Sequence, residues 1–311
     1  MSSPRRSNAW LLPGLALGGA ALAAVWLSDP ARLLRVEFAR QRLIAGAKVR
    51  RLSLADGQIV YLEAGRGPPL LHIHGFTGMK ENFLPLIGPL GKGWRHLAPD
   101  LPGWGESERI EGADYGYAEQ ARRLAEFIDA IGAGPVDVVG HSMGGGIAAV
   151  LAARYPERVR RLVLMDASGV RFSDNAFGLA VLEGENPFGV SDEASLRNYL
   201  GLVFDKVPWM PRSVARLMVR QRIAQAGFEQ GILDSIGRSE DAFLPEQEAA
   251  AIRAPTLLLW CRGDRVIDAS AAAIYAAKIP DNRIVLMDGA SHMPMFECKA
   301  ATVAALREFL Q

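Results

Sequence analysis

One serine in this chain stands in a setting that favours nucleophilic chemistry. It lies in Gly140-His141-Ser142-Met143-Gly144, between an apolar run at 135–139 and an alanine-rich run that extends to residue 153. The first run predicts a buried strand and the second a helix, so Ser142 should stand on the sharp turn between them. Flanking glycines let the strand and the helix pack closely around a strained serine. The Ser142 hydroxyl is therefore expected to project from the sheet as a nucleophile.

A nucleophilic serine needs a general base within hydrogen-bond reach, and the base needs a partner that orients it. His292 is the only histidine that follows Ser142, and it comes soon after an apolar run at 283–287. Asp264 follows another such run at 256–260. Both would stand at carboxyl ends of strands, where the catalytic groups of open sheets gather. The sequence thus predicts Ser142, Asp264 and His292 as a catalytic triad in the chain order serine, acid, base.

The orienting acid has rivals in the sequence. Asp268 and Asp288 lie close to the other motifs, and Asp166 ends the apolar run at 159–165. Some enzymes with this kind of triad place the acid at that earlier strand. Asp166 is therefore the alternative to Asp264 that the residues leave open.

Attack on a carbonyl carbon places negative charge on its oxygen, which two backbone N–H groups can stabilise. One donor should be Met143, because it begins the predicted helix, where free amides and the helix dipole favour negative charge. The other should be Phe76, in the His74-Gly75-Phe76 loop after the apolar run at 70–73. Since both oxyanion donors belong to the backbone, the Phe76 and Met143 side chains should matter mainly for shape.

Several nearby polar residues favour structural roles. His72 and His74 would share one strand face, but no acidic or cysteine partner accompanies them, so we expect no metal site. His141 adjoins the serine at a turn and should point elsewhere. Asp100 begins a Pro- and Gly-containing segment and is typical of a turn. Neither a metal nor a cofactor is predicted.

The predicted site requires a sheet that brings several strand ends together. Strands are predicted at 48–54, 58–63, 70–73, 94–98, 135–140, 159–165, 256–260 and 283–287, with Asp56-Gly57 as a hairpin turn between the first two. Helices are predicted at 117–131, 269–277 and 300–310, besides the one after Ser142. This alternation indicates an α/β fold with a mostly parallel eight-stranded sheet flanked by helices.

The segment 168–248 interrupts the alternation and lacks clear buried strands. Prolines and aromatic residues punctuate what should be short helices, which predicts a helical cap inserted into a core formed by 48–167 and 249–311. Seven of its apolar side chains fit either the cap interior or an acyl pocket equally well: Phe172, Phe177, Phe188, Trp209, Met210, Met218 and Phe228.

Composition excludes some functions and leaves others open. Half of the 311 residues are apolar, which suffices for a packed core, and the net charge of +1 gives no footprint for nucleic acid. Cys261 and Cys298 lack metal-ligand spacing and fit either two buried side chains or a disulfide. The sequence does not indicate an oligomeric state.

The N-terminus has the composition of a membrane segment. Residues 7–28 carry no charge, and the apolar run 10–27 would span about 27 Å as a helix, close to a hydrocarbon core of about 30 Å. Trp10 and Trp26 stand at its ends, where interfacial aromatics belong. A single-pass membrane anchor within 1–30 is predicted. Ala21-Leu22-Ala23 leaves a cleaved signal peptide, and hence export, as the alternative.

Residues 31–47 are predicted to form a basic linker helix. It could lie on an anionic membrane surface or serve as a solvated linker. Arginines after the apolar run outnumber the two before it, which favours a cytoplasmic catalytic domain. An uncleaved export signal would give the opposite orientation, so membrane sidedness stays open.

Residues 48–311 resemble the α/β-hydrolase superfamily. The motifs that carry the resemblance are His74-Gly75-Phe76, Asp100-Leu101-Pro102-Gly103-Trp104-Gly105-Glu106-Ser107, Gly140-His141-Ser142-Met143-Gly144-Gly145, Gly263-Asp264 and Gly289-Ala290-Ser291-His292. Three further segments are similar to the cap of bacterial lipases related to membrane-anchored monoacylglycerol lipases: Leu164-Met165-Asp166-Ala167-Ser168-Gly169-Val170, Gly184-Glu185-Asn186-Pro187-Phe188 and Val207-Pro208-Trp209-Met210-Pro211.

The narrower resemblance implies a serine hydrolase that cleaves carboxylic esters of lipid-like substrates through an acyl-enzyme, with no cofactor. Carbon–carbon bond hydrolases, lactonases and cofactor-free perhydrolases use the same triad and stay open as alternatives. Relatives with an aspartate nucleophile are disfavoured by Ser142. A non-catalytic ligand-binding protein is the remote alternative.

Overall fold

The computed structural model describes residues 29–311. Almost all of the predicted anchor or signal segment therefore lies outside the described residues. Within 29–311, the structure contains no helix with both the length and the apolar character needed to cross a membrane.

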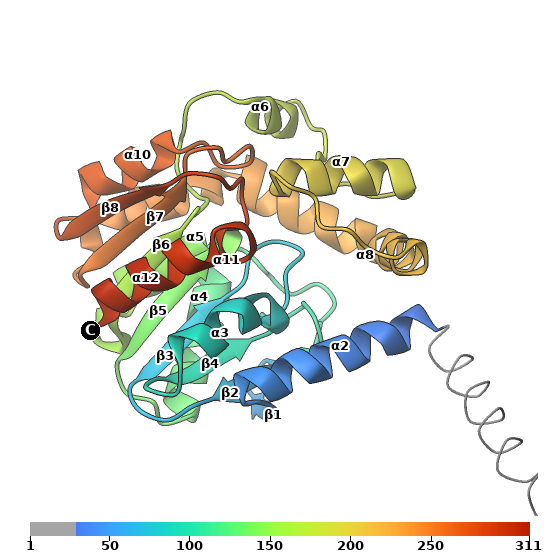
Figure 1. Cartoon of the computed structure of the whole chain (residues 1–311). Helices are drawn as coiled ribbons and strands as arrows, with labels where there is room; N and C mark the ends of the chain where they lie inside the picture. The colour runs from blue at the N-terminus through green and yellow to red at the C-terminus, as the bar shows by residue number, and fades with distance from the viewer. Residues whose placement is uncertain (1–28) are drawn as a thin grey trace, which may run out of the picture.

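A single sheet of eight strands forms the centre of the protein (Figure 1). Its spatial order is β1-β2-β4-β3-β5-β6-β7-β8. Strands β1 and β2 and strands β2 and β4 pair antiparallel, and all other neighbours pair parallel. The predicted mostly parallel sheet is thus confirmed. The strands are β1 (Ala47–Leu54), β2 (Gly57–Ala64), β3 (Pro69–Ile73), β4 (Arg95–Pro99), β5 (Val136–His141), β6 (Val159–Met165), β7 (Thr256–Cys261) and β8 (Asn282–Met287).

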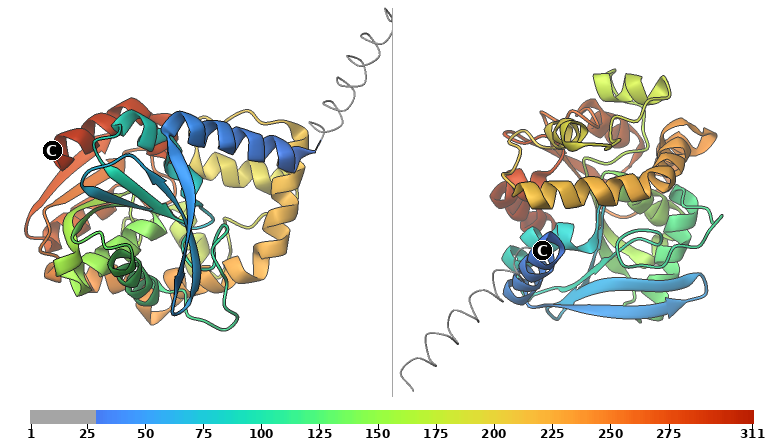
Figure 2. Two further views of the ribbon diagram at one scale, coloured as in Figure 1. Left: turned by 90° about the horizontal axis from the view of Figure 1, so that it is seen from below. Right: turned by 90° about the vertical axis from the view of Figure 1, so that its right-hand side faces the viewer.

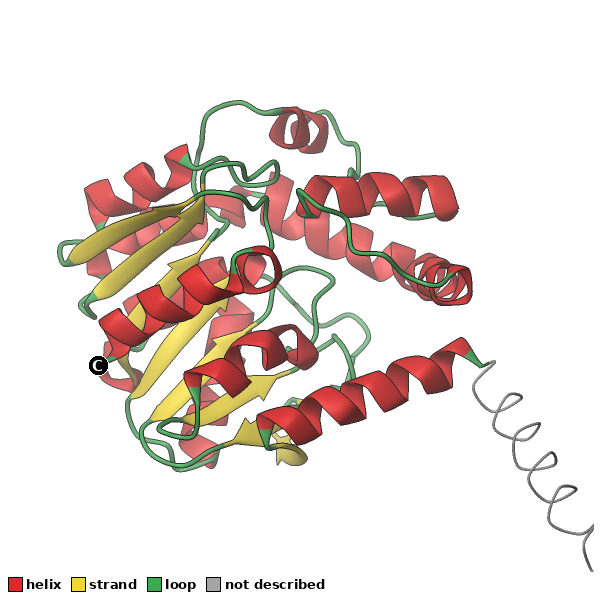
Figure 3. Ribbon diagram, in the orientation of Figure 1, coloured by secondary structure: helices red, strands yellow, loops and turns green. Residues whose placement is uncertain are grey.

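Helices cover both faces of this sheet (Figure 3). Successive strand residues point to opposite faces, so each central strand serves two cores. On β6, Leu162 and Leu164 belong to one core, and Val163 and Met165 belong to the other. The first core includes α4 (Tyr117–Ala130), α5 (Met143–Arg154) and α10 (Ser270–Lys278), and the second includes α3 (Leu84–Leu90), α11 (Pro294–Glu297) and α12 (Lys299–Leu310).

The hairpin turn between β1 and β2 lies one residue earlier than predicted. Leu54 pairs with Gly57, so Ala55 and Asp56 form the turn and Gly57 already belongs to β2. Gly57 has a φ of 105°, a conformation that glycine adopts without a steric penalty. The Asp-Gly pair therefore marks the hairpin, but its glycine supplies the first paired residue of the returning strand.

The segment between β6 and β7 is helical and lies beyond the carboxyl ends of the strands (Figure 1). It contains α6 (Ala176–Leu182), α7 (Glu193–Val203), α8 (Arg212–Arg238), η3 (Glu240–Phe243), α9 (Leu244–Glu248) and η4 (Ala249–Ala251). The expectation of short helices is wrong for α8, which has 27 residues and crosses one side of the molecule (Figure 2). No proline interrupts the chain between Pro211 and Pro245, and its glycines cost only about 1 kcal/mol each relative to alanine.

The basic segment that precedes the sheet forms α2 (Pro30–Ala45). The Asp29 side chain accepts a hydrogen bond from the N–H of Ala31, and Pro30 occupies the first helical position, so the helix begins here. It ends at Gly46, whose φ of 65° is the left-handed conformation typical of a helix C-terminus. Helix α2 contacts α3 of the core and α8 of the cap segment.

Candidate active site

Ser142 occupies a strained turn between β5 and α5, as the glycine-flanked motif predicts. Its φ of 53° and ψ of −124° are rare for a residue with a side chain and cost about 1–3 kcal/mol. The turn is held because the Ser142 N–H donates to the Met165 carbonyl at 3.0 Å and the Ser142 carbonyl accepts from Gly145 at 2.8 Å. The neighbouring strand and the first turn of α5 thus fix the serine backbone from two sides.

Two glycines let the loop after β3 approach this turn. A Cβ atom at Gly144 would lie 2.3 Å from the Ile73 carbonyl oxygen, and one at Gly75 would lie 2.8 Å from the Cβ of Ser142. Real Cβ atoms are essentially never found this close to another heavy atom. The absence of side chains at these positions therefore lets the loop after β3 lie directly against the serine turn.

The structure brings the three predicted triad residues together. His292 Nε2 lies 2.8 Å from Ser142 Oγ, and His292 Nδ1 lies 2.7 Å from Asp264 Oδ2. All three side chains are buried. Because a carboxylate oxygen accepts at Nδ1, the His292 proton belongs there and the Nε2 lone pair faces the serine hydroxyl. The Asp264 carboxylate is itself oriented, since Oδ1 accepts from the N–H groups of Val266 and Ile267 at 2.7 and 3.0 Å.

The rival acids make other contacts. Asp166 accepts from the Cys261 N–H at 2.8 Å, and burial together with the nearby negative charge of Asp264 raises its pKa well above the usual range. Asp268 accepts from the N–H of Ser270 at the start of α10, and Asp288 is exposed and pairs with Arg262. Asp264 is therefore the carboxylate that the fold directs to His292.

The two residues predicted to donate to the oxyanion share a cavity with Ser142. Phe76, Ser142 and Met143 all line one cavity. Among the described residues, neither the Phe76 nor the Met143 backbone N–H makes a hydrogen bond to the protein. Both amides therefore remain available to an oxygen atom bound beside Ser142.

His74 supports the loop that carries Phe76. Its Nδ1 donates to the Gly75 carbonyl at 2.8 Å, and its Nε2 accepts from the Leu101 N–H at 3.0 Å. This pair of bonds requires the neutral ring, consistent with burial, which lowers the pKa of His74. His72 instead lies 3.0 Å from His96, ring nitrogen to ring nitrogen, so each histidine has a protein partner.

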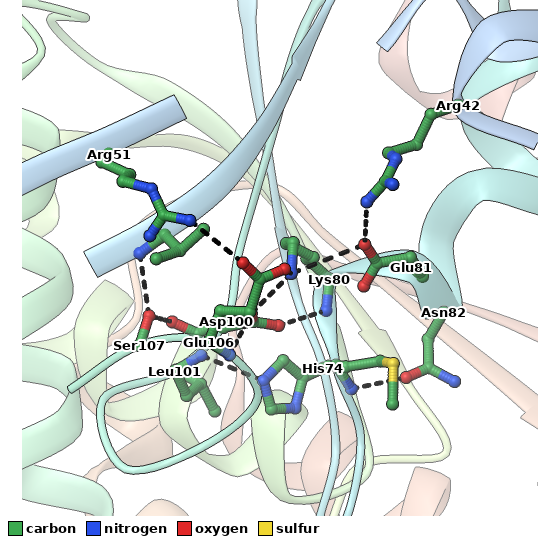
Figure 4. A network of polar contacts seen from close by, with 12 residues as sticks. Arg42, Arg51, His74, Lys80, Glu81, Asn82, Asp100, Leu101, Glu106 and Ser107 are labelled. Carbon is green, nitrogen blue, oxygen red and sulfur yellow. Dashed lines mark hydrogen bonds and ion pairs between the residues drawn. The ribbon is translucent and has the colours of Figure 1, made fainter. Parts of the chain in front are cut away.

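A buried ionic network fixes the next part of this loop (Figure 4). Asp100 accepts from the Lys80 backbone N–H at 2.7 Å, from Lys80 Nζ at 2.8 Å and from the Glu106 N–H at 2.8 Å. Asp100 therefore does more than stabilise the predicted turn. It also binds Lys80, which follows the loop that carries Phe76. Arg42 of α2 pairs with Glu81 at 3.1 Å, which ties the preceding helix to the same network.

A cavity of about 500 Å³ extends from Ser142 into the cap segment. The seven undecided apolar residues divide clearly around it. Phe172, Phe177 and Phe188 line the cavity, whereas Phe228 packs against Trp104 and Tyr115 outside it. Met210 and Met218 pack against a separate small cluster in the cap, and Trp209 is 87% exposed.

The structure also distinguishes between the two alternatives for the cysteines, a disulfide or two unpaired side chains. Cys261 is buried and Cys298 is half-buried, and both are free thiols. In the described part of the chain, no group of three histidine, cysteine, aspartate or glutamate side chains could hold a metal ion.

His141 has a contact with the triad that the sequence did not reveal. Its Nε2 donates to the backbone carbonyl of His292 at 2.8 Å, and this bond helps to fix the backbone of the general base. Burial, and then the charge of His292, lowers the pKa of His141 to about 3. The only sequence signal for this role was its place next to Ser142, which does not indicate what the ring contacts.

This depressed pKa predicts acid sensitivity of the fold. The unfolded chain takes up a proton on His141 near its ordinary pKa of 6.5, whereas the folded chain resists until about 3. Stability is therefore present above the unfolded pKa and is lost as the pH falls between these values. His141→Gln keeps an N–H donor for His292 but cannot titrate. We expect its urea midpoint to fall less than that of the wild type between neutral pH and about pH 5. Equal falls in the two proteins would contradict the assignment.

The chain matches the family model of the alpha/beta hydrolase fold over residues 68–298. It is 33% identical to Lipase 1 of Psychrobacter immobilis over 84% of each chain. It is 27% identical to human monoacylglycerol lipase ABHD6 over 97% of this chain and 94% of that protein. Among solved structures, a bacterial membrane phospholipase A superposes with a TM-score of 0.87 at 36% identity, covering 96% of this chain and 97% of the other.

The chain therefore belongs to the α/β-hydrolase family. Within that family it is an ester hydrolase of the lipase and esterase class, similar to bacterial lipases and to monoacylglycerol lipases.

Proposed function

We propose that this protein hydrolyses monoacylglycerol-like esters through an acyl-enzyme intermediate. The observation that carries the proposal is the hydrogen-bonded chain Ser142–His292–Asp264, whose Ser142 lines a mainly apolar cavity. Ser142 Oγ attacks the ester carbonyl while His292 Nε2 takes the serine proton. Asp264 holds the Nδ1–H tautomer and stabilises the imidazolium that forms. The backbone N–H groups of Phe76 and Met143 hold the oxyanion.

Collapse of the tetrahedral intermediate breaks the bond to the leaving alcohol, which receives the proton from His292. Water then enters, gives a proton to His292 and attacks the acyl carbon. The second collapse releases the fatty acid and returns the proton to Ser142. No group beyond these residues and water is needed to balance either step.

The cavity supports a long acyl chain as the acid part of the substrate. Its walls are largely apolar side chains from both the core and the cap, and a lipid chain would be buried along them. Val181 of α6 stands in this wall and is itself buried. A bulkier side chain there would shorten the space available to the acyl chain.

Val181→Phe should shift the chain-length preference toward short acids. We expect kcat/KM for dodecanoyl esters to fall about tenfold or more, because a chain that no longer enters loses its burial energy. Butanoyl esters, which reach less far, should change about threefold at most. A panel of p-nitrophenyl esters and monoacylglycerols of increasing length measures both effects, with Val181→Ile as the matched control. Equal losses at all lengths would contradict the assignment of this cavity to the acyl chain.

The same panel tests the function itself. Hydrolysis of monoacylglycerols with a preference for medium or long chains is expected. Rapid turnover of lactones or of dienoate carbon–carbon substrates, with none of monoacylglycerols, would overturn the proposal in favour of another reaction on the same triad.

We also propose that the protein associates with membranes through residues 1–28, which lie outside the described part of the chain. The support is the uncharged sequence of 7–28 and the similarity to proteins that include a membrane phospholipase A. Deleting residues 1–28 should move the protein from the membrane pellet to the supernatant after ultracentrifugation, with ester hydrolysis retained. Continued sedimentation of the shortened protein with membranes would instead assign the association to α2 or to the cap.

A further inference from the structure

A second, smaller cavity also includes Ser142 in its lining and has walls that differ from those of the acyl cavity. Its volume is about 50 Å³, against about 500 Å³ for the acyl cavity. The two cavities share Phe76, Ser142 and Phe188, so they meet at the nucleophile. His292 lines only the small cavity, and Met143 lines only the large one.

The position of His292 assigns an occupant to each cavity. The general acid must protonate the oxygen of the leaving alcohol, so the alcohol departs on the side where His292 lies. The acyl chain then extends the other way, into the large cavity. The small cavity cannot hold a second acyl chain, and its walls include polar groups from Thr77, Asn82 and Tyr199.

Thr77 adopts a backbone conformation that its side chain makes costly. Its φ is 57°, and a β-branched residue in this left-handed region is a genuine outlier. Glycine would adopt the same backbone without strain. Such strain persists where the surroundings hold it, and its presence points to a role for the side chain. Thr77 directly follows the predicted oxyanion donor Phe76, so that role lies beside the reacting carbonyl.

The Thr77 side chain meets a hydroxyl group from the cap. Thr77 Oγ1 lies 3.0 Å from the Tyr199 hydroxyl oxygen, and Tyr199 belongs to α7. Helix α7 is fixed against the triad, because its Val203 carbonyl accepts from the His292 N–H at 3.0 Å. The Arg222 guanidinium lies 4.7 Å from the centre of the Tyr199 ring and holds it in place.

This hydroxyl pair keeps unused hydrogen-bonding capacity. Each hydroxyl has one proton and two acceptor lone pairs, and the bond between them consumes one proton and one lone pair. Within residues 29–311 neither oxygen has a further partner. One O–H donor and several lone pairs therefore remain for a molecule in the small cavity, which Ser142 and His292 also line.

We propose that Thr77 and Tyr199 recognise the alcohol part of the substrate and select esters of small hydroxylated alcohols, with glycerol monoesters as the fitting class. This proposal rests on the proposed ester hydrolysis. It adds the identity of the residues that bind the leaving alcohol. Esters of alcohols that carry no second hydroxyl group cannot form these hydrogen bonds to Thr77 and Tyr199.

The test compares two esters with the same acid, 1-monodecanoylglycerol and methyl decanoate, in the same detergent micelles. Thr77→Val keeps the β-branched shape without the hydroxyl, and Tyr199→Phe keeps the ring. Each should lower the ratio of kcat/KM for the glycerol ester to that for the methyl ester by about threefold to tenfold, the value of one lost hydrogen bond. Thr77→Ser restores a hydroxyl and should keep the ratio within about twofold of the wild type.

Tyr155→Phe is the matched control, because Tyr155 directly follows α5 and lines neither cavity. Equal losses on both esters in Thr77→Val and Tyr199→Phe would overturn the alcohol site and leave the pair as a structural link between cap and core. Should one variant fail to fold, the other decides, since the two alter different elements. A wild type that hydrolyses neither ester would overturn the proposed function itself, a result distinct from an unchanged ratio.

Discussion

Replacing Ser142 with alanine should reduce kcat for ester hydrolysis by about 10⁴-fold or more. Among residues 29–311, the substitution removes the only oxygen hydrogen-bonded to His292 Nε2, so no covalent intermediate can form. The residual rate would come from the oxyanion amides and from substrate positioning alone. Release of fatty acid at constant pH measures the effect directly.

Two controls accompany this variant. Ser53→Ala alters an exposed serine on the edge strand β1, away from the turn that carries Ser142, and should leave kcat within about twofold of the wild type. Thermal unfolding of Ser142→Ala should show an intact fold, because the backbone bonds of the turn do not involve the hydroxyl. More than about a hundredth of wild-type activity in a folded Ser142→Ala would exclude Ser142 as the nucleophile.

Replacing Asp264 with asparagine should lower kcat by about 10⁴-fold. An amide in place of the carboxylate leaves the shape of the site but no longer fixes the Nδ1–H tautomer of His292 or stabilises its charged form. The lone pair that should face Ser142 is then lost from much of the population. The same kinetic assay, with circular dichroism to confirm folding, measures this effect.

Asp166→Asn is the matched comparison, because it makes the same chemical change on the neighbouring strand. Burial and the Asp264 charge raise the pKa of Asp166, which favours a neutral side chain, and its bond to the Cys261 N–H needs only an acceptor. Asparagine supplies that acceptor, so we expect a loss of about tenfold at most. Reversed effects of the two substitutions would move the orienting acid to Asp166.

The three triad residues could be predicted because the sequence immediately around each one indicates its position in the fold. Ser142 sits in a glycine-flanked turn, and Asp264 and His292 each follow an apolar strand. A parallel sheet then brings such strand ends to one edge, so the sequence was enough to predict that these three residues meet. Every predicted strand lies within one residue of the observed one at either end. The buried parallel strands are marked by continuous apolar runs, and the exposed antiparallel β1 is marked by the Asp56-Gly57 turn that follows it.

The features that the sequence did not reveal depend on contacts between distant segments. The Thr77–Tyr199 bond joins residues 122 positions apart, and no local pattern marks either partner. The contact of His141 with His292 spans 151 positions. The length of α8 was hidden because three glycines weaken its helical pattern, and packing against the cap and core restores it. Which cap aromatics line the cavity was likewise decided by how the helices pack.

Labelling with a fluorophosphonate, followed by peptide mapping, tests the central claim most directly. The reagent is attacked only by an activated serine and leaves a stable covalent mark on it. We expect a single adduct on the peptide that contains Ser142, no labelling in Ser142→Ala, and much slower labelling in Asp264→Asn than in Asp166→Asn. An adduct on another residue, or a folded wild type that does not react, would contradict the assignment of Ser142, His292 and Asp264 as the catalytic triad.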